Sequence, residues 1–229
     1  MNNKTILRAI FDILPLAIAV IPWGILAGAI SIQVGLSSWE AQALSMFVYA
    51  GAAQLSAITL FGTGAGLFAI SSSVFVISSR HILYSLDFRN DIIILPLRWR
   101  VAIAFFLTDE MYVVTKNYMK EKGSFCKYYA ITSGITFYVL WNISTFIGIQ
   151  LANTVSNIDS LGLDFAIVTI FIAMTIKNLQ NSSMFIVTFS SAILSIVLKD
   201  IFPNNYILVA SLISMFIGYI HHKRFNDEY

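Results

Sequence analysis

Long apolar stretches dominate this chain and decide what it can fold into. A helix that crosses a membrane needs about 20 mostly apolar residues, because its backbone groups must be satisfied inside the hydrocarbon layer. Measured this way, the sequence has apolar stretches at 10–33, 41–61, 67–86, 101–115, 129–151, 163–176, 182–198 and 204–220. We therefore expect an all-α integral membrane protein, with residues 1–229 forming a single transmembrane domain and a polytopic bundle of six to eight apolar segments.

Composition supports the membrane assignment. Only 11% of the 229 residues are charged, whereas soluble domains carry about 25%. The net charge of +2 and the scattered basic residues argue against nucleic acid as a partner. The single cysteine, Cys126, can form neither an internal disulfide nor a cysteine-based metal site. We expect no metal and no cofactor.

Several segments are predicted to be broken or re-entrant. The stretches 101–115, 163–176 and 182–198 are short for full crossings. The first stretch contains Pro15 and Pro22, and proline removes a backbone donor and kinks a helix. Broken and short helices together are typical of transporters that bind substrate near the middle of the membrane.

Loop charges predict the orientation. Both ends of the chain carry basic residues, and the loop at 116–127 carries four lysines, whereas the loops at 34–40 and 152–163 carry no Lys or Arg. Eight crossings with both termini in the cytoplasm fit the preference of basic loops for that side. Arg89, Arg98 and Arg100 disagree with this topology unless a neighbouring segment does not cross or the acidic residues nearby draw that stretch toward the membrane.

Small residues and one amide mark the second stretch. Gly51 opens a Gly-Ala-Ala-Gln run that ends at Gln54. Small side chains let membrane helices approach closely, and an amide in an apolar helix must find a partner. This pattern fits a packing face with one interhelical hydrogen bond, or a contact to a polar substrate group. Gly24 and Gly28 form a GxxxG pair with the same packing interpretation.

The ionisable residues inside apolar stretches are the strongest functional candidates, because charge is costly in lipid. If residues 67–86 continue as one helix, Arg80, Tyr84 and Asp87 share a face. Arg80 could pair with a carboxylate, reach the membrane interface or bind an anionic group, and His81 could carry protons. Asp109 and Glu110 point about 100° apart on a helix, so they serve different partners. One of them is a natural partner for Arg80, unless the pair is only a structural ion pair at a helix break.

The order of these motifs resembles the AzlC-type branched-chain amino acid exporters, the large subunits of two-component systems. The resemblance is carried, mainly over residues 10–115, by Pro22-Trp23-Gly24 with Gly28, Tyr49-Ala50-Gly51-Ala52-Ala53-Gln54, Arg80-His81-Ile82-Leu83-Tyr84 and Leu107-Thr108-Asp109-Glu110. The family pattern has Phe-Gly where this chain has Trp23-Gly24, and usually Asn where it has Ser79. The resemblance implies export of valine, leucine, isoleucine and sometimes methionine, together with a small AzlD-type membrane subunit.

A secondary exporter in the bacterial cytoplasmic membrane, driven by the proton gradient, is therefore the leading hypothesis. No nucleotide-binding P-loop is present in the sequence to power transport directly. A membrane-embedded enzyme is the alternative from another class, but the sequence has no H-E-x-x-H motif and no G-x-S-x-G elbow. A channel or a structural subunit is the third possibility.

Overall fold

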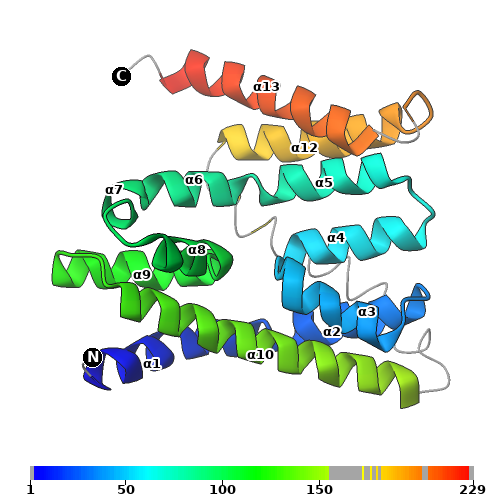
Figure 1. The fold of residues 1–229 in the computed structure, drawn as a ribbon. Coiled ribbons are helices and arrows are strands. Elements are labelled where there is room, and N and C mark those ends of the chain that lie inside the picture. Colours follow the sequence, from blue (N-terminus) through cyan, green and yellow to red (C-terminus); the bar gives the residue numbers. More distant parts are fainter. Residues whose placement is uncertain are drawn as a thin grey trace. The chain divides into compact units, whose positions relative to one another are not determined.

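The computed structural model describes residues 3–154, 182–202 and 206–226, together with positions 172, 176 and 179. All regular structure in these residues is helical, as the sequence predicts (Figure 1). The chain groups into two compact units, one of Met1–Ile58 with Ile77–Ser156 and one of Thr59–Val76 with Asn157–Tyr229. All the ionisable candidates and Gln54 belong to the first unit. The single transmembrane domain stays a prediction.

The helices of the first unit include several short ones. In chain order the helices with most of their residues in it are α1 (Asn3–Ala19), α2 (Ile21–Gln33), α3 (Ser38–Ala43), the π-helix η1 (Leu44–Val48), α4 (Gly51–Gly62), α6 (Arg80–Asp87), α7 (Arg89–Ile92), α8 (Leu97–Phe105), α9 (Asp109–Lys122) and α10 (Lys127–Thr154). The second unit holds most of α5 (Leu67–Ser78) and all of α12 (Ser182–Leu198) and α13 (Tyr206–Asn226).

Fewer helices can cross a membrane than the six to eight segments that we predicted. Among the described residues, Leu67–Asp87 and Lys127–Thr154 are long and apolar enough, and α1 with α2 makes a third span if the bent pair is counted as one. The axis turns by 51° between α1 and α2, where Pro22 lies in the first turn of the second helix. Within the described residues the number is lower than predicted because stretches such as 41–61 and 101–115 are divided into short helices. The stretch 163–176 lies almost wholly outside the described residues.

Helix α2 packs very closely on α10 through glycines. A Cβ atom placed on Gly24 would lie 2.6 Å from the Cβ of Ser144, and one on Gly28 would collide with the carbonyl oxygen of Thr145. In the other direction, a Cβ on Gly148 would collide with the carbonyl of Ile25. Only glycine permits this approach, which is the packing role expected of a GxxxG pair.

A first broken pair of helices lies along the second half of α10. The Ser38 hydroxyl accepts a hydrogen bond from Asn153 at 3.1 Å, and η1 ends at a break around Tyr49, whose ring lies 4.9 Å from that of Tyr138. Beyond the break α4 turns back, since Gln54 hydrogen-bonds to Ser45 of η1. The stretch 41–61 is therefore not one crossing helix but a pair that enters and returns.

A second broken pair lies along the first half of α10. Near the start of α8, the Trp99 ring is 5.4 Å from that of Tyr128, and Phe106 at its end is 5.6 Å from Tyr138. After the break at 106–108, α9 returns and leads through residues 123–126 to the start of α10. Because this pair does not cross, Arg98 and Arg100 lie at the lysine-bearing end of the unit. This geometry matches one of the two explanations for the conflict in loop charge.

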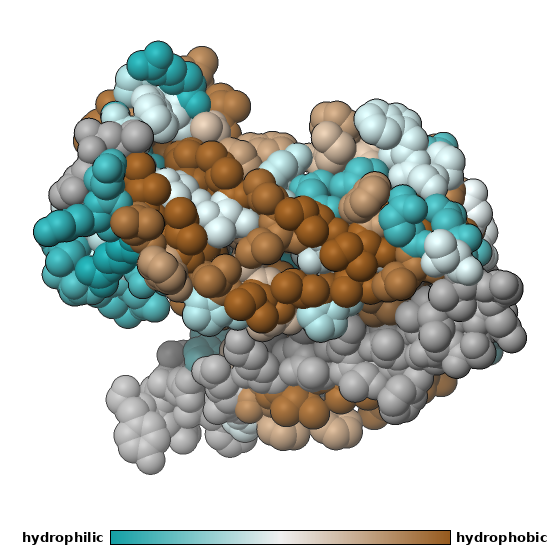
Figure 2. All heavy atoms as spheres, turned by 90° about the horizontal axis from the view of Figure 1, so that it is seen from below, coloured by the Kyte–Doolittle hydropathy of each residue, from teal (hydrophilic) through white to brown (hydrophobic). Residues whose placement is uncertain are grey.

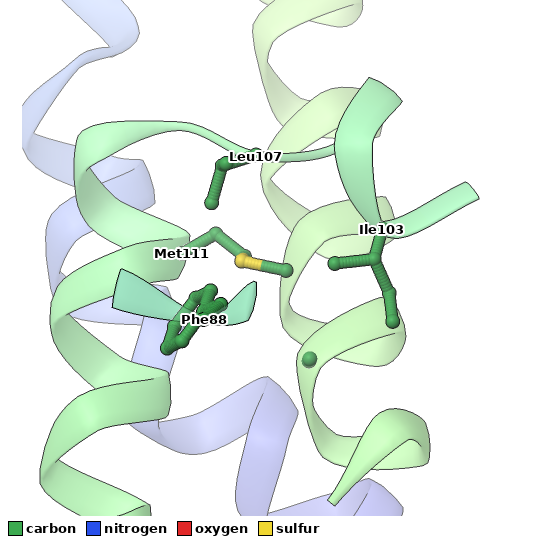
Figure 3. Close-up of a cluster of buried hydrophobic side chains, with 5 residues drawn as sticks. Phe88, Ile103, Leu107 and Met111 are labelled. Carbon is green, nitrogen blue, oxygen red and sulfur yellow. The ribbon is translucent and has the colours of Figure 1, made fainter. Parts of the chain in front are cut away.

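A compact apolar cluster fixes the second broken pair. Phe88, Ile103, Leu107 and Met111 pack together with Ala130 (Figure 3), and each is at most 8% exposed. The cluster joins the end of α6, both helices of the pair and the start of α10. It holds the break between α8 and α9 against the rest of the unit.

The outer surface of the first unit suits a lipid environment. Exposed large apolar side chains line α1 and α10, among them Phe11, Ile18, Ile143 and Phe146. Figure 2 shows hydrophobic side chains in a continuous area on one face, with hydrophilic ones on either side of it. A soluble protein seldom leaves so much apolar surface uncovered.

In the second unit α12 and α13 pack side by side. Ser183 and His221 lie 3.1 Å apart through the hydroxyl and Nδ1, and Gly218 leaves room for Val187. These contacts join the start of α12 to the later part of α13, so the two helices run antiparallel.

Candidate functional site

The two broken pairs meet at Tyr138, which lies 11 residues into α10 and therefore about 16 Å along its axis. The Tyr49 ring stacks on Phe105 with centroids 6.1 Å apart, and both rings contact Tyr138. The breaks thus come together near the middle of a helix long enough to span the membrane. Such breaks bring helix N-termini, with their partial positive charge, to the depth where transporters bind substrate.

Tyr49 makes the first break. It is the one non-glycine residue with a positive φ, 45°, in the described part of the chain, and it is 6% exposed. A bulky side chain in the left-handed region is strained, so the surrounding packing must hold it there. Its hydroxyl donates to the carbonyl of Gly134 at 3.4 Å.

Thr108 ends the second break and caps α9. Its hydroxyl accepts a hydrogen bond from the Met111 amide at 3.3 Å, so the helix begins at Asp109. Asp109 and Glu110 therefore both occupy the first turn, where the helix dipole favours negative charge. Capping places the two carboxylates at the meeting point of the breaks.

Arg80 and Asp109 form an ion pair, with Nη1 of the arginine 2.8 Å from Oδ2 of the aspartate. This is one of the two pairings that the sequence suggested. Two atoms of the pair remain unused: Arg80 Nε and Asp109 Oδ1 are buried and have no hydrogen-bond partner. An unmade hydrogen bond on a buried charged group is costly, so these atoms are suited to a ligand that supplies both an acceptor and a donor.

Glu110 lies on a different side of α9 from Asp109, because successive residues of a helix point about 100° apart. It forms no ion pair within the described residues and lies within electrostatic range of Tyr49. It is partly buried. Because it forms no ion pair within the described residues, Glu110 stays a candidate for proton exchange.

Gln54 belongs to a separate, uncharged network at the first break. Its amide donates to Ser45 Oγ at 2.8 Å, and that hydroxyl lies 2.8 Å from Thr145 Oγ1 of α10. All three side chains are fully buried. The amide oxygen of Gln54 has no partner. The expected interhelical hydrogen bond thus exists through Ser45, and Gly51 leaves room beside it for the Trp141 ring.

His81 lies near the ion pair but makes only local contacts. Its Nδ1 is 3.0 Å from the carbonyl oxygen of Ser78, and its ring is edge-on to Tyr84 at 5.8 Å. The structure thus brings Arg80, His81 and Asp109 to one side of the breaks. No group of three metal-binding side chains occurs among the residues that the structure describes.

Sequence reasoning missed the aromatic and hydroxyl partners of the site. Tyr49 stands in one of the family motifs but was given no role. Tyr138, Ser45 and Thr145 are ordinary residues for a membrane helix, and nothing in their spacing shows that they meet. Lys116 was read only as a loop charge, although it pairs with Asp87 at 2.8 Å. Its place seven residues after Asp109, on the same face of a helix, was the available signal.

Comparison with known proteins agrees with the membrane location. The profile of a family described as "AzlC protein" matches residues 15–155, which include all the ionisable candidates and Gln54. Several relatives carry the name "Uncharacterized membrane protein", and two of them illustrate the match. One, from Helicobacter pylori, is 24% identical and covers 93% of this chain and 94% of its own. The other, from Archaeoglobus fulgidus, is 30% identical and covers 73% of each chain. No solved structure matches.

Proposed function

The chain belongs to the AzlC family of membrane proteins, and from that premise we propose that it is a secondary exporter of branched-chain amino acids. Its substrates are valine, leucine and isoleucine, with methionine as a further candidate. It acts in the bacterial cytoplasmic membrane with both termini in the cytoplasm. It is a carrier and not an enzyme.

The ion pair of Arg80 and Asp109 is the observation that carries this proposal. An amino acid zwitterion has a carboxylate and an ammonium group on the same carbon. The free Nε of Arg80 can donate to the carboxylate, and the free Oδ1 of Asp109 can accept from the ammonium. A ligand of this kind satisfies both unused atoms at once. The aromatic rings at the meeting breaks offer apolar contact for its side chain.

Glu110 supplies the coupling to protons in this proposal. Carboxylates recur in proton-driven transporters because protonation removes a charge that is costly in the membrane. Since Asp109 is held by Arg80 and Glu110 forms no ion pair among the described residues, Glu110 is the better proton carrier. His81 is the second candidate for this role.

A small AzlD-type membrane subunit completes the exporter. The large exposed apolar residues of α1 and α10 leave ample surface for lipid or for such a subunit. We expect this chain to export poorly alone and at full rate with the subunit.

Counterflow in proteoliposomes tests the function. Liposomes that contain the chain and its small subunit, loaded with unlabelled leucine, should accumulate labelled leucine, and excess valine or isoleucine should compete. Lysine and glutamate should not compete. Conduction without exchange would identify a channel, and neither activity would favour an enzyme, so either result would overturn the proposal.

The variant Glu110→Gln tests whether Glu110 couples transport to protons. The variant should retain leucine exchange, because the Arg80–Asp109 pair is intact, but a pH gradient should no longer drive net transport. Proton-driven transport at the parent rate in this variant would remove Glu110 from the mechanism.

A further inference from the structure

Helices α6 and α9 contact each other through three successive layers of side chains. Arg80 pairs with Asp109 in the first layer. In the second, the rings of Tyr84 and Tyr112 stack with centroids 4.3 Å apart and planes 16° apart. The third layer is the ion pair of Asp87 and Lys116.

The layers come from one face of each helix. Positions 80, 84 and 87 share a face of α6, and 109, 112 and 116 share a face of α9, as three- and four-residue steps require. Both helices therefore run in the same direction. The charges are reversed between the outer layers, since α6 supplies the cation in the first and the anion in the third.

The third layer lies at the end of the span. Asp87 is the last residue of the candidate span Leu67–Asp87, and Arg80 lies seven residues earlier, about 10 Å deeper along the helix. The Tyr112 hydroxyl donates to Asp87 at 2.9 Å and so ties the stack to the outer ion pair. Phe88, fully buried, lies under Lys116, whose ammonium is 5.9 Å from the ring centre. Any ligand that reaches Arg80 between these helices from the lysine-bearing end must pass the stack and the outer pair.

We propose that the Tyr84–Tyr112 stack and the Asp87–Lys116 pair form a gate on the lysine-bearing side of the transport site. This inference rests on the transport function proposed above. An exporter loads from the cytoplasm, and the lysine-rich loop is predicted to face it. The gate is closed in this structure and opens in each cycle when the outer ion pair separates. Exposed ion pairs are suited to this role because they are weak enough to break.

Cysteine labelling tests the gate without reference to the substrate. Cys126 is the single native cysteine, so Cys126→Ser leaves a clean background for a reporter. His81→Cys places the reporter on α6 between the outer pair and Arg80. In inside-out vesicles, a membrane-impermeant maleimide should label this reporter slowly when the gate is closed. Lys116→Asp puts two like charges together and should raise the labelling rate roughly five-fold, given the modest strength of exposed pairs.

Two matched variants complete the experiment. The exchange D87K/K116D restores the attraction with reversed signs and should bring the labelling rate back close to that of the parent, which also shows that the protein folds. Lys120→Asp makes the same charge change on the same helix, where no ion pair is found within the described residues, and should leave the rate unchanged.

The proposal is overturned if Lys116→Asp leaves labelling at the parent rate. It is equally overturned if the charge exchange fails to restore slow labelling, or if Lys120→Asp accelerates it as much. The labelling pattern does not depend on which substrate is carried, so a failed leucine counterflow would refute the proposed substrate and leave this result standing.

Discussion

The two broken helix pairs of the first unit have similar paths and opposite chemistry. Each enters along α10, breaks near Tyr138 and turns back, and each begins a new helix at the break, with Gly51 in one and Asp109 in the other. At the first break the polar groups are neutral, and Gln54, Ser45 and Thr145 are fully buried. At the second they are charged.

The difference follows from what each break has to hold. The amide N–H of Gln54 and the two hydroxyls bond to one another, and the oxygen of Gln54 that stays unpaired is neutral, so the first network serves well as a fixed support. Charged groups in the same place are expensive unless they do something that neutral groups cannot. We therefore expect the first break, with its neutral groups, to position the helices. We expect the second break, with its charged groups, to bind and release the substrate. Below, these are called the neutral break and the charged break. The predictions below test that division.

Asp109→Asn should have the largest effect. The substitution keeps the size of the side chain but removes the charge that holds Arg80 and accepts from the substrate. A hydrogen bond to a charged group contributes about 2 kcal/mol, so counterflow should slow about thirty-fold. Initial rates per amount of folded protein measure this.

Asp91→Asn is the matched control for that variant. Asp91 is also a carboxylate near the end of α6, and it forms no ion pair within the described residues. The counterflow rate of Asp91→Asn should equal that of the parent protein. Equal rates for Asp109→Asn and the parent would contradict the assignment of binding to the charged break.

Gln54→Leu should have a smaller effect, and mainly on stability. It removes the hydrogen bond to Ser45, which keeps Thr145 as a partner. We expect a loss of about 1 kcal/mol of unfolding free energy, the usual contribution of a neutral hydrogen bond, seen as a lower melting temperature in detergent. Gln150→Leu, an exposed amide on α10, is the control and should not lower it. A thirty-fold loss of transport in a stable Gln54→Leu protein would move binding to the neutral break.

The sequence predicted the helical class of fold and the pairing of Arg80 with an acidic residue. Helices and the lipid setting follow from apolar length, which is a local property. Arg80, Asp109 and Glu110 stand out because charge is rare in such stretches, and that cost alone indicates a partner. Even the shared face of Arg80, Tyr84 and Asp87 follows from helical spacing.

The number of crossings and the neutral network could not be predicted in the same way. The stretch 41–61 is apolar throughout, and the break at Tyr49 depends on packing against Phe105 and Tyr138 from distant parts of the chain. Hydroxyl groups are tolerated almost anywhere in membrane helices, since they can bond to their own backbone. Ser45 and Thr145 therefore gave no signal until α10 was seen beside η1.

The smallest predicted effect is on the acid sensitivity of the melting temperature. It concerns two carboxylates at the outer ends of the broken helix pairs. Glu121, near the end of α9, accepts two hydrogen bonds from Arg8 of α1, one of them at 2.9 Å to Nη1, and these lower its pKa from 4.5 to about 2. Because the folded-state pKa is depressed, its stabilising contribution is present above 4.5 and is lost as the pH falls toward 2. Glu40, before α4, has its pKa lowered by hydrogen bonds from Ser37 in its own turn.

Glu121→Gln should therefore remove part of the acid sensitivity of the melting temperature in this window. Glu40→Gln should remove less, because Glu40 only caps its own short helix, whereas Glu121 joins α1 to α9 across 113 residues of chain. The effect of Glu121→Gln should also shrink in high salt, since exposed ion pairs are screened. Melting curves of the two variants and the parent, recorded on both sides of the window, measure this. A larger loss of acid sensitivity in Glu40→Gln than in Glu121→Gln would contradict this prediction. It would show that the first broken helix pair, and not the second, depends on a charged group for its stability.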